Sequence, residues 1–405
     1  MRILMISQHY PPRLSGYAVI CADAAGALRE RGHRVRVLTS VDEPDGPFED
    51  GAVRKVLRRC PVEGYQAAGL QSVLSYHEHR RVFLRNCGVA RAEAVTFEAD
   101  VVMVWQFDSL GPDMVQGLQV LGVPVVFSVA DVFLCILRTL LVEDGSLAWR
   151  VARSWLYRRF VRELKRVPLI LCTDALKSHY VAGGFDARQM TVIPITIEPR
   201  FIATRPAKPG PGTRLLYAGR LHPWKGVDVA IRAAALLNAE APGRFVLDVV
   251  GDGPQAYVTE LENLAVRLGM TEAVRFLGPR DREDLMLLYD DYDLALVPSV
   301  CHEGGPLTMI EAMARGVPVV ASNRGGPKSV ITDGTDGLLV EPESPEALAR
   351  GIGHLADDPA LRKSMGRRAI ASVRERFSLQ NHVTQIEELL ACLVERRGRK
   401  PVSPR

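Results

Sequence analysis

The chain has 405 residues, too many for one hydrophobic core and enough for two domains of about 200 residues each. Hydrophobic residues make up 47% and charged residues 24%, as in ordinary globular proteins, and a net charge of +4 is too small to predict a nucleic-acid partner. The seven cysteines are scattered without Cys-x-x-Cys spacing, which argues against a disulfide framework and a zinc site.

The start of the chain predicts a doubly wound α/β domain. An apolar strand over 2–7, a loop that ends at Gly16, an amphipathic helix and a second strand over 35–39 form an opening βαβ unit. The unit lacks G-x-G-x-x-G, which disfavours a dinucleotide oxidoreductase. Residues 1–6 are too short for the apolar core of a signal peptide, and no apolar run approaches the length of a membrane span. We therefore expect a cytoplasmic protein in a reducing compartment.

Two basic segments leave open a peripheral contact with the inner face of a membrane. Basic residues collect in 54–91 and again in 149–166, a predicted helix that also carries Trp155 and Phe160. One interpretation packs the apolar stripe of that helix into the core and leaves the charges in water. The other places the helix on anionic phospholipid. The sequence supports both.

Composition also divides the chain into domains. Further strands are predicted over 101–105, 123–129, 169–173 and 191–194, and a segment rich in Pro and Gly follows over 199–213. We predict an N-terminal Rossmann-like domain over 1–198, a hinge over 199–213, a second Rossmann-like domain over 214–377, and a last helix with a basic tail over 378–405.

The second domain opens with a strand over 214–218 and a loop that carries two cations. Arg220 and Lys225 stand on this strand-to-helix loop, where the guanidinium fork and the ammonium point charge suit a diphosphate. The alternative is an ordinary solvated pair. His222, in the same loop, is expected to be exposed and incidental.

A glycine corner between strand and helix is the centre of the second domain. A strand over 294–297 is followed by Gly304-Gly305-Pro306, a helix and a strand over 317–321, and this order brings backbone amides and a helix dipole to one place that suits an anion. Glu303 and Glu311 bracket the corner, and carboxylates accept hydrogen bonds from sugar or ribose hydroxyls. The alternative is a pair of ordinary surface glutamates.

The stretch from Glu303 to Glu311 resembles the Glu-x7-Glu signature of retaining glycosyltransferases of family 4, which have the GT-B fold. The Gly-Arg-x4-Lys-Gly pattern over 219–226 is similar to the phosphate-binding loop of that family. The resemblance covers nearly the whole chain and is strongest over 212–342. It implies an α/β protein of the GT-B class, with two facing Rossmann-like domains and the donor cleft between them. By the same resemblance, the domain over 1–198 would be the acceptor side, and the helix of 378–405 would cross back to it.

The resemblance also implies roles for individual residues. Glu303 would be the catalytic residue at the hydroxyls of the donor sugar, and Glu311 would bind the ribose. The donor-binding residues implied are Gly16, Arg220, Lys225, Gly304, Gly305, Pro306, Leu307 and Glu311. No metal and no cofactor is expected, because the cations replace a divalent ion and the nucleotide sugar (a UDP- or GDP-sugar) is a substrate. The predicted reaction is retaining transfer of a hexosyl unit to an acceptor glycan or glycolipid in cell-envelope polysaccharide or glycolipid synthesis.

Three departures from the family keep other functions open. Ala130 stands where relatives commonly have a histidine, residues 195–198 replace an Asn-Gly-Val-Asp sequence, and Gly16 lacks a glycine neighbour. A nucleotide-sugar-binding scaffold with impaired catalysis, or a sugar-nucleotide epimerase of the same fold, are therefore the alternatives. Turnover of nucleotide sugars would separate them.

Overall fold

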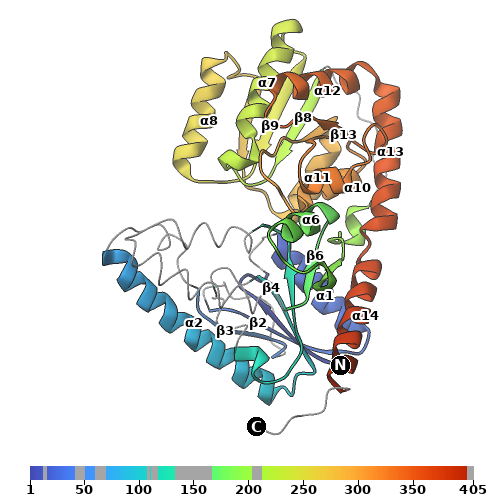
Figure 1. The fold of residues 1–405 in the computed structure, drawn as a ribbon. Coiled ribbons are helices and arrows are strands. Elements are labelled where there is room, and N and C mark those ends of the chain that lie inside the picture. Colours follow the sequence, from blue (N-terminus) through green and yellow to red (C-terminus); the bar gives the residue numbers. More distant parts are fainter. Residues whose placement is uncertain are drawn as a thin grey trace. The chain divides into compact units, whose positions relative to one another are not determined.

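The structure is a computed structural model, and it describes residues 1–11, 16–41, 51–59, 70–106, 110, 117–132, 167–202 and 212–398. The chain divides into two compact units, and each is described here by itself (Figure 1). Unit 1 comprises Met1–Cys172, Lys177–Ile193 and Leu379–Arg405, and unit 2 comprises Thr173–Leu176 and Pro194–Ser378. The last helix of the chain therefore belongs to the unit in which the chain begins.

Seven parallel strands form the sheet in the described part of unit 1, in the order β3-β2-β1-β4-β5-β6-β7. The strands are β1 (Arg2–Ser7), β2 (Arg34–Ser40), β3 (Val53–Leu57), β4 (Val101–Gln106), β5 (Val125–Val129), β6 (Leu169–Leu171) and β7 (Met190–Val192). The central strands are continuous apolar runs, as expected where helices cover both faces of a parallel sheet. Strand β3 was not predicted from the sequence.

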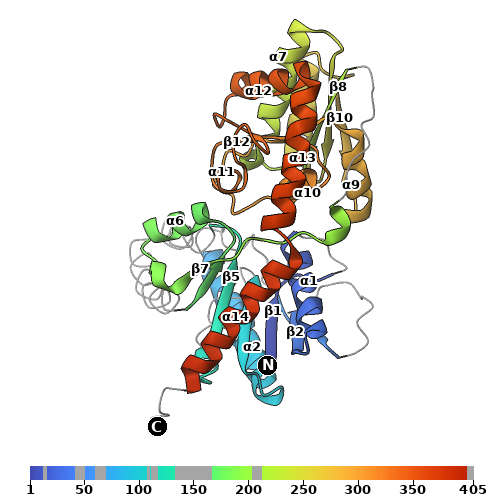
Figure 2. The same cartoon turned by 90° about the vertical axis from the view of Figure 1, so that its right-hand side faces the viewer.

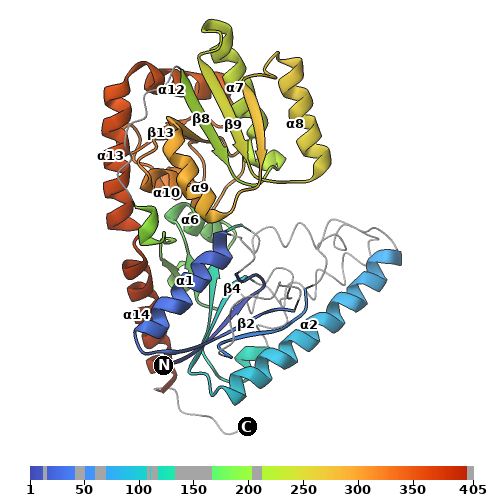
Figure 3. The same ribbon diagram turned by 180° about the vertical axis from the view of Figure 1, so that it is seen from behind.

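Helices cover both faces of this sheet. They are α1 (Gly16–Glu30), α2 (Leu70–Thr96), α6 (Asp174–Ala182) and α14 (Leu379–Gly398), with a 3-10 turn over Ala187–Gln189. Helix α1 buries Ala18, Cys21, Ala25 and Leu28, which share one face at helical spacing. Helix α14 contacts α1 and β4, whereas α2 lies on the other side of the sheet (Figures 1 and 3).

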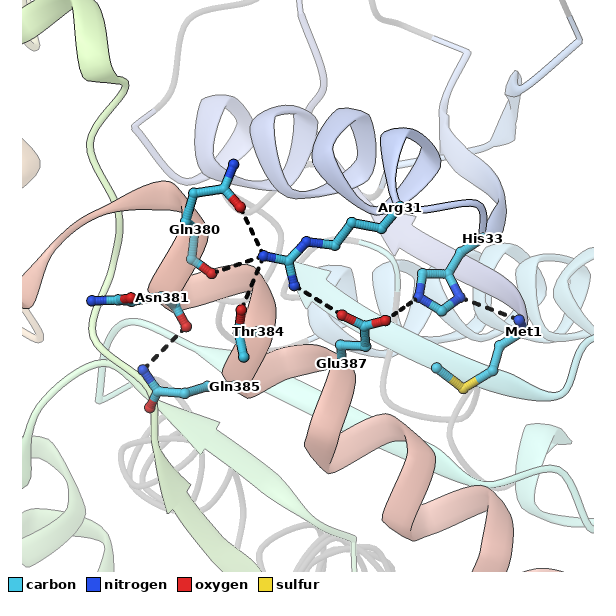
Figure 4. A network of polar contacts seen from close by, with 8 residues as sticks. All are labelled: Met1, Arg31, His33, Gln380, Asn381, Thr384, Gln385 and Glu387. Atoms are coloured by element: carbon cyan, nitrogen blue, oxygen red, sulfur yellow. Dashed lines mark hydrogen bonds and ion pairs between the residues drawn. The ribbon is translucent and has the colours of Figure 1, made fainter.

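A polar network (Figure 4) fixes α14, which lies beside α1 (Figure 2), to the rest of unit 1. The guanidinium of Arg31 contacts the Glu387 carboxylate at 2.8 Å and the Thr384 hydroxyl at 2.9 Å. The imidazole of His33 contacts the other carboxylate oxygen of Glu387 at 2.8 Å and the Met1 ammonium at 3.2 Å. Hydrogen bonds from His33 and Arg31 lower the pKa of Glu387. Charge-assisted contacts thus join the first and last elements of the unit.

Six parallel strands form the sheet of unit 2 within the described residues, in the order β10-β9-β8-β11-β12-β13. The strands are β8 (Thr213–Ala218), β9 (Phe245–Val250), β10 (Val274–Gly278), β11 (Leu294–Val297), β12 (Val319–Ser322) and β13 (Leu338–Val340). Strand β8 pairs with β9 on one side and β11 on the other, so the winding direction reverses between β8 and β11. Ligands bind at such a switch point, outside the carboxyl ends of the strands.

The helices of unit 2 begin at recognisable signals in the sequence. They are α7 (Val227–Glu240), α8 (Gln255–Arg267), α9 (Arg282–Leu288), α10 (Leu307–Ala314), α11 (Gly326–Val330), α12 (Pro345–Asp357) and α13 (Pro359–Arg376), with 3-10 turns over Pro199–Phe201, Pro223–Lys225 and Tyr289–Asp291. The Asp281, Ser344 and Asp358 side chains cap α9, α12 and α13. Helices α7 and α12 pack together over the apolar residues of the sheet.

The boundary between the units differs from the sequence prediction. The long segment of unit 2 begins at Pro194, whereas the sequence predicts a first domain to residue 198 and a hinge over 199–213. Ile197 pairs with Ser378, and the Thr196 hydroxyl donates to the Phe377 carbonyl at 3.2 Å, which joins these residues to unit 2. Residues 203–211 of the predicted hinge, the predicted helix 149–166 and tail residues 399–405 lie outside the described residues. In the ranges that the structure describes, no helix is long and apolar enough to cross a membrane.

Candidate active site

Two loops meet at the switch point of unit 2. Strand β8 ends at Ala218 and leads into the loop 219–226, and β11 ends at Val297 and leads into the loop 298–306. Since β8 and β11 are paired parallel neighbours, both loops leave the same edge of the sheet side by side. The Arg220–Lys225 loop and the Glu303 corner, chosen separately from the sequence, therefore form one site.

Gly226 brings these two loops into direct contact. Its backbone is left-handed, with φ of 68°, and an added Cβ would lie 2.0 Å from the Pro298 carbonyl oxygen. The neighbouring Trp224 carbonyl accepts a hydrogen bond from the Val300 amide at 2.9 Å. Only glycine meets both requirements, the left-handed conformation and the close approach.

The candidate catalytic carboxylate is paired with one of the predicted phosphate ligands. The Lys225 ammonium lies 2.5 Å from a carboxylate oxygen of Glu303, and the Ser299 hydroxyl donates to the other oxygen. Only 10% of the Glu303 side chain and 18% of the Lys225 side chain are exposed. The interpretation of Glu303 as an ordinary surface glutamate is therefore wrong. Limited solvent access also strengthens the attraction between the two charges.

A second glycine corner positions the backbone of the first. The Gly326 amide donates to the Glu303 carbonyl at 2.7 Å, and a Cβ added at Gly326 would lie 2.4 Å from the Gly304 carbonyl oxygen. That carbonyl also accepts from the Thr173 hydroxyl at 2.9 Å, and Gly305 lies against the Thr173 side chain. The loop thus reaches α10 in one defined conformation.

Helix α10 begins directly after the glycine corner. Pro306 is its N-cap and Leu307 its first residue, so the proline stands one position before the helix rather than inside its first turn. The backbone N–H groups of its first turn have no partner within the helix, and they lie at the N-terminal end, where the helix dipole is positive. This arrangement suits an anion beside Lys225.

Glu311 is buried, so it too differs from an ordinary surface glutamate. It is 3% exposed, and its carboxylate lies 3.4 Å from the Tyr289 hydroxyl and 3.6 Å from Nε of Arg282. Burial raises its pKa to about 7, against a lowering by the Arg282 charge. Arg282 is itself fixed by Glu198 at 3.2 Å and by the face of the Phe201 ring.

The remaining predicted residues fall in two places. Arg220 is exposed in the β8–α7 loop, and its carbonyl accepts from the Tyr217 hydroxyl at 2.8 Å. Gly16 belongs to unit 1, where it is the exposed first residue of α1. Ala130 directly follows β5 in the same unit. The structure therefore places Arg220, Lys225 and Glu303 on two neighbouring loops and Glu311 inside the helix that follows the second of them, whereas Gly16 belongs to unit 1.

One feature of the site was missed from the sequence. His222 is half-buried and stacks on Trp224, with ring centroids 3.4 Å apart and planes inclined by 20°. Burial, followed by the charges of Arg220 and Lys225, lowers its pKa. His222 is therefore less exposed than the sequence predicts, because its ring packs against its neighbour in the 3-10 turn.

Metal ligands are not gathered in the part of the chain that the structure describes. Among those residues, no three His, Cys, Asp or Glu side chains stand close enough to hold a metal ion. Positive charge at the site comes instead from side chains that include Arg220, Lys225 and Arg282.

Two doubly wound units in one chain are the architecture expected of the GT-B class of proteins. Two family models match the chain in tandem: a Glycosyl transferase 4-like domain over residues 15–196 and Glycosyl transferases group 1 over residues 200–372. The chain belongs to the group 1 glycosyl transferases of the family 4 type.

Curated relatives match part of the chain. An exopolysaccharide phosphotransferase of Streptomyces coelicolor is 38% identical over 231 residues, which are 56% of this chain and 24% of that protein. A D-inositol 3-phosphate glycosyltransferase of Corynebacterium aurimucosum is 38% identical over 178 residues, which are 43% of this chain and 42% of that protein. The chain thus spans less than half the length of these relatives.

Solved structures match nearly the whole chain at low identity. HepE of Anabaena in complex with UDP is 23% identical, with a TM-score of 0.73, over 97% of this chain and 100% of that one. Sucrose-phosphate synthase of Thermosynechococcus elongatus is 22% identical, with a TM-score of 0.76, over 98% of this chain and 99% of that one. The prediction of the GT-B fold is confirmed.

Proposed function

We propose that the protein transfers a hexosyl unit from a nucleotide-diphosphate sugar to an acceptor hydroxyl, with retention at the anomeric carbon. The observation that carries the proposal is the shielded Lys225–Glu303 pair beside Arg220 at the switch point of unit 2. The solved complexes of HepE with UDP and with UDP-glucose support a nucleotide sugar as the donor.

The two cations and the start of α10 would hold the diphosphate. As the sugar–phosphate bond breaks, negative charge moves onto the diphosphate, and Arg220, Lys225 and the α10 amides stabilise it there. Lys225 neutralises Glu303 in the structure, so a bound diphosphate shares or replaces that contact. The Glu303 carboxylate is then released toward hydroxyls of the donor sugar, and no metal ion is required.

Glu311 would act on another part of the same donor. We assign it to the ribose, whose paired hydroxyls donate to a carboxylate. Contact with two hydroxyls would offset the burial that raises its pKa, because hydrogen bonds to the charged form stabilise it.

The acceptor is proposed to be a glycan or a glycolipid, and the setting to be cell-envelope polysaccharide or glycolipid synthesis. The match to an exopolysaccharide phosphotransferase supports this setting. Exposed Arg81, Arg85 and Arg91 on α2 support a peripheral contact with an anionic membrane at the cytoplasmic face.

Donor binding and turnover test the proposal. The wild-type protein should bind a nucleotide sugar from a panel of UDP- and GDP-sugars, and it should hydrolyse or transfer that sugar. Arg220→Ala and Lys225→Ala should each weaken binding of the matching nucleoside diphosphate, since each removes a charge-assisted contact of about 1.5–3 kcal/mol. Arg232→Ala, an exposed arginine on α7, is the matched control.

The outcomes separate the proposed function from its alternatives. Calorimetric titration with unchanged affinity in both loop variants would refute the diphosphate site. Tight binding without hydrolysis or transfer to any acceptor would indicate a scaffold, and isomerisation of the sugar would indicate an epimerase.

A further inference from the structure

An exposed tryptophan stands beside the candidate active site and has no role in the function proposed above. Trp224 directly precedes Lys225, and it is 44% exposed. All the other large hydrophobic residues that are exposed in the described part of the chain are aliphatic. A large aromatic surface left in water is a favourable place for a ligand to cover.

The indole is held in a fixed position. The His222 ring stacks on it at 3.4 Å, and Pro223 begins the 3-10 turn that carries it. Its backbone carbonyl is hydrogen-bonded to Val300, and the close approach of Gly226 to Pro298 fixes the end of the turn. A side chain that is already ordered loses little conformational entropy when a ligand covers it.

The chemistry of the stacked His222 and Trp224 rings favours a ligand ring that is uncharged and carries polarised C–H groups. Burial and the charges of Arg220 and Lys225 lower the pKa of His222, so its imidazole is uncharged at neutral pH. The face of an indole carries negative π density, which attracts C–H groups and repels anions. The apolar face of a pyranose presents such C–H groups, while its hydroxyls stay available for charged side chains.

Charged partners for such hydroxyls stand next to the indole. Lys225 follows Trp224 directly, and its ammonium contacts Glu303 at 2.5 Å. Val300, which is bonded to the Trp224 carbonyl, lies in the loop that leads to Glu303. The aromatic ring and the carboxylate–ammonium pair therefore lie on two loops that are in direct contact.

We propose that Trp224 is a stacking platform for a pyranose ring, and this subsite rests on the proposed glycosyl transfer. The ring belongs either to the donor sugar or to the acceptor sugar. The shared chemistry is the stacked pyranose, and the two sources give different results in the test.

The test compares Trp224→Ala and Trp224→Phe with the wild-type protein. Titration calorimetry measures affinity for the nucleotide sugar that the wild type binds best and for its nucleoside diphosphate. Steady-state transfer to methyl glucoside, galactoside and mannoside measures KM and kcat for simple acceptors. Leu236→Ala, which removes a 41% exposed side chain on α7, is the matched control.

If the indole stacks on the donor sugar, Trp224→Ala should weaken the affinity for the nucleotide sugar about tenfold, which corresponds to about 1.4 kcal/mol. The affinity for the nucleoside diphosphate should not change. An acceptor platform predicts unchanged donor affinity and a rise of about tenfold in the KM of a glycoside, with kcat near the wild-type value. In both cases Trp224→Phe should keep donor affinity and KM close to the wild-type values, because it keeps an aromatic ring. The Leu236 variant should behave as wild type.

Two results would overturn the platform alone. Equal weakening of nucleotide sugar and nucleoside diphosphate would place the nucleobase or phosphate on the indole, and unchanged parameters in every arm would leave it without a ligand. A wild-type protein that binds no nucleotide sugar would instead overturn the proposed function and the platform with it.

Discussion

Replacement of Glu311 by glutamine should stabilise the fold while it removes donor affinity. The carboxyl is buried, and its pKa is raised from 4.5 to about 7. Between these two values the folded state binds more protons than the unfolded state, so stability falls as the pH rises and stays low above about 7. The difference corresponds to about 3 kcal/mol at alkaline pH.

The Glu311→Gln variant has no such ionisation. Arg282 keeps Glu198 as a partner at 3.2 Å when its longer contact of 3.6 Å with Glu311 is lost. The variant should therefore be more stable than the wild type by about 2–3 kcal/mol at about pH 8, and the gain should vanish as the pH falls toward about 4.5. Affinity for the nucleoside diphosphate should fall, because a carboxamide binds the ribose hydroxyls less well than a carboxylate.

Urea unfolding followed by circular dichroism, repeated across this pH range, measures the difference in midpoint between variant and wild type. Equal midpoints at every pH would mean that Glu311 titrates normally. A variant that is less stable than the wild type at alkaline pH would mean that Arg282 stabilises the buried carboxylate by more than its burial costs.

Three further results are expected. Activity should persist with EDTA, since two cations and a helix terminus handle the diphosphate charge, and recovery that requires Mg²⁺ or Mn²⁺ would contradict this. Gly326→Ala should abolish donor binding, because its Cβ would lie 2.4 Å from the Gly304 carbonyl oxygen, whereas Gly353→Ala meets only an ordinary contact of 3.7 Å and should bind normally. Glu387→Ala should increase hydrogen exchange in α14, measured by mass spectrometry, whereas Gln385→Ala should not.

The positions of the buried strands could be predicted closely from the sequence, whereas the strand at the edge of the first sheet could not. The strands predicted over 2–7 and 294–297 have apolar centres, and both match strands of the structure in full. Strand β3, Val53–Leu57, reads VRKVL and is only partly buried at the sheet edge. Its two charged residues interrupt the apolar pattern, so the sequence did not predict a strand there. Helix α2 has no clear apolar stripe, because arginines are spread over it.

The residues of the candidate site could be selected from the sequence, but the contacts between them could not. The residue types and spacing at 219–226 and 303–311 indicated phosphate and hydroxyl binding. The contact of Lys225 with Glu303 joins residues 78 positions apart, and it depends on the order of β8 and β11 in the sheet. The burial of Glu311 depends likewise on Tyr289 and Arg282, which local patterns do not connect to it.

The position of α14 has a consequence for the order in which the chain can fold as it is synthesised. Val383, Ile386 and Leu390 of α14 are fully buried in unit 1, yet they are translated after the whole of unit 2. The unit that begins the chain must therefore wait for the last helix, whereas unit 2 is complete once Ser378 has been added. Until then the face of α1 that receives α14 stays open to water, and a chain that stops before residue 379 keeps that face uncovered.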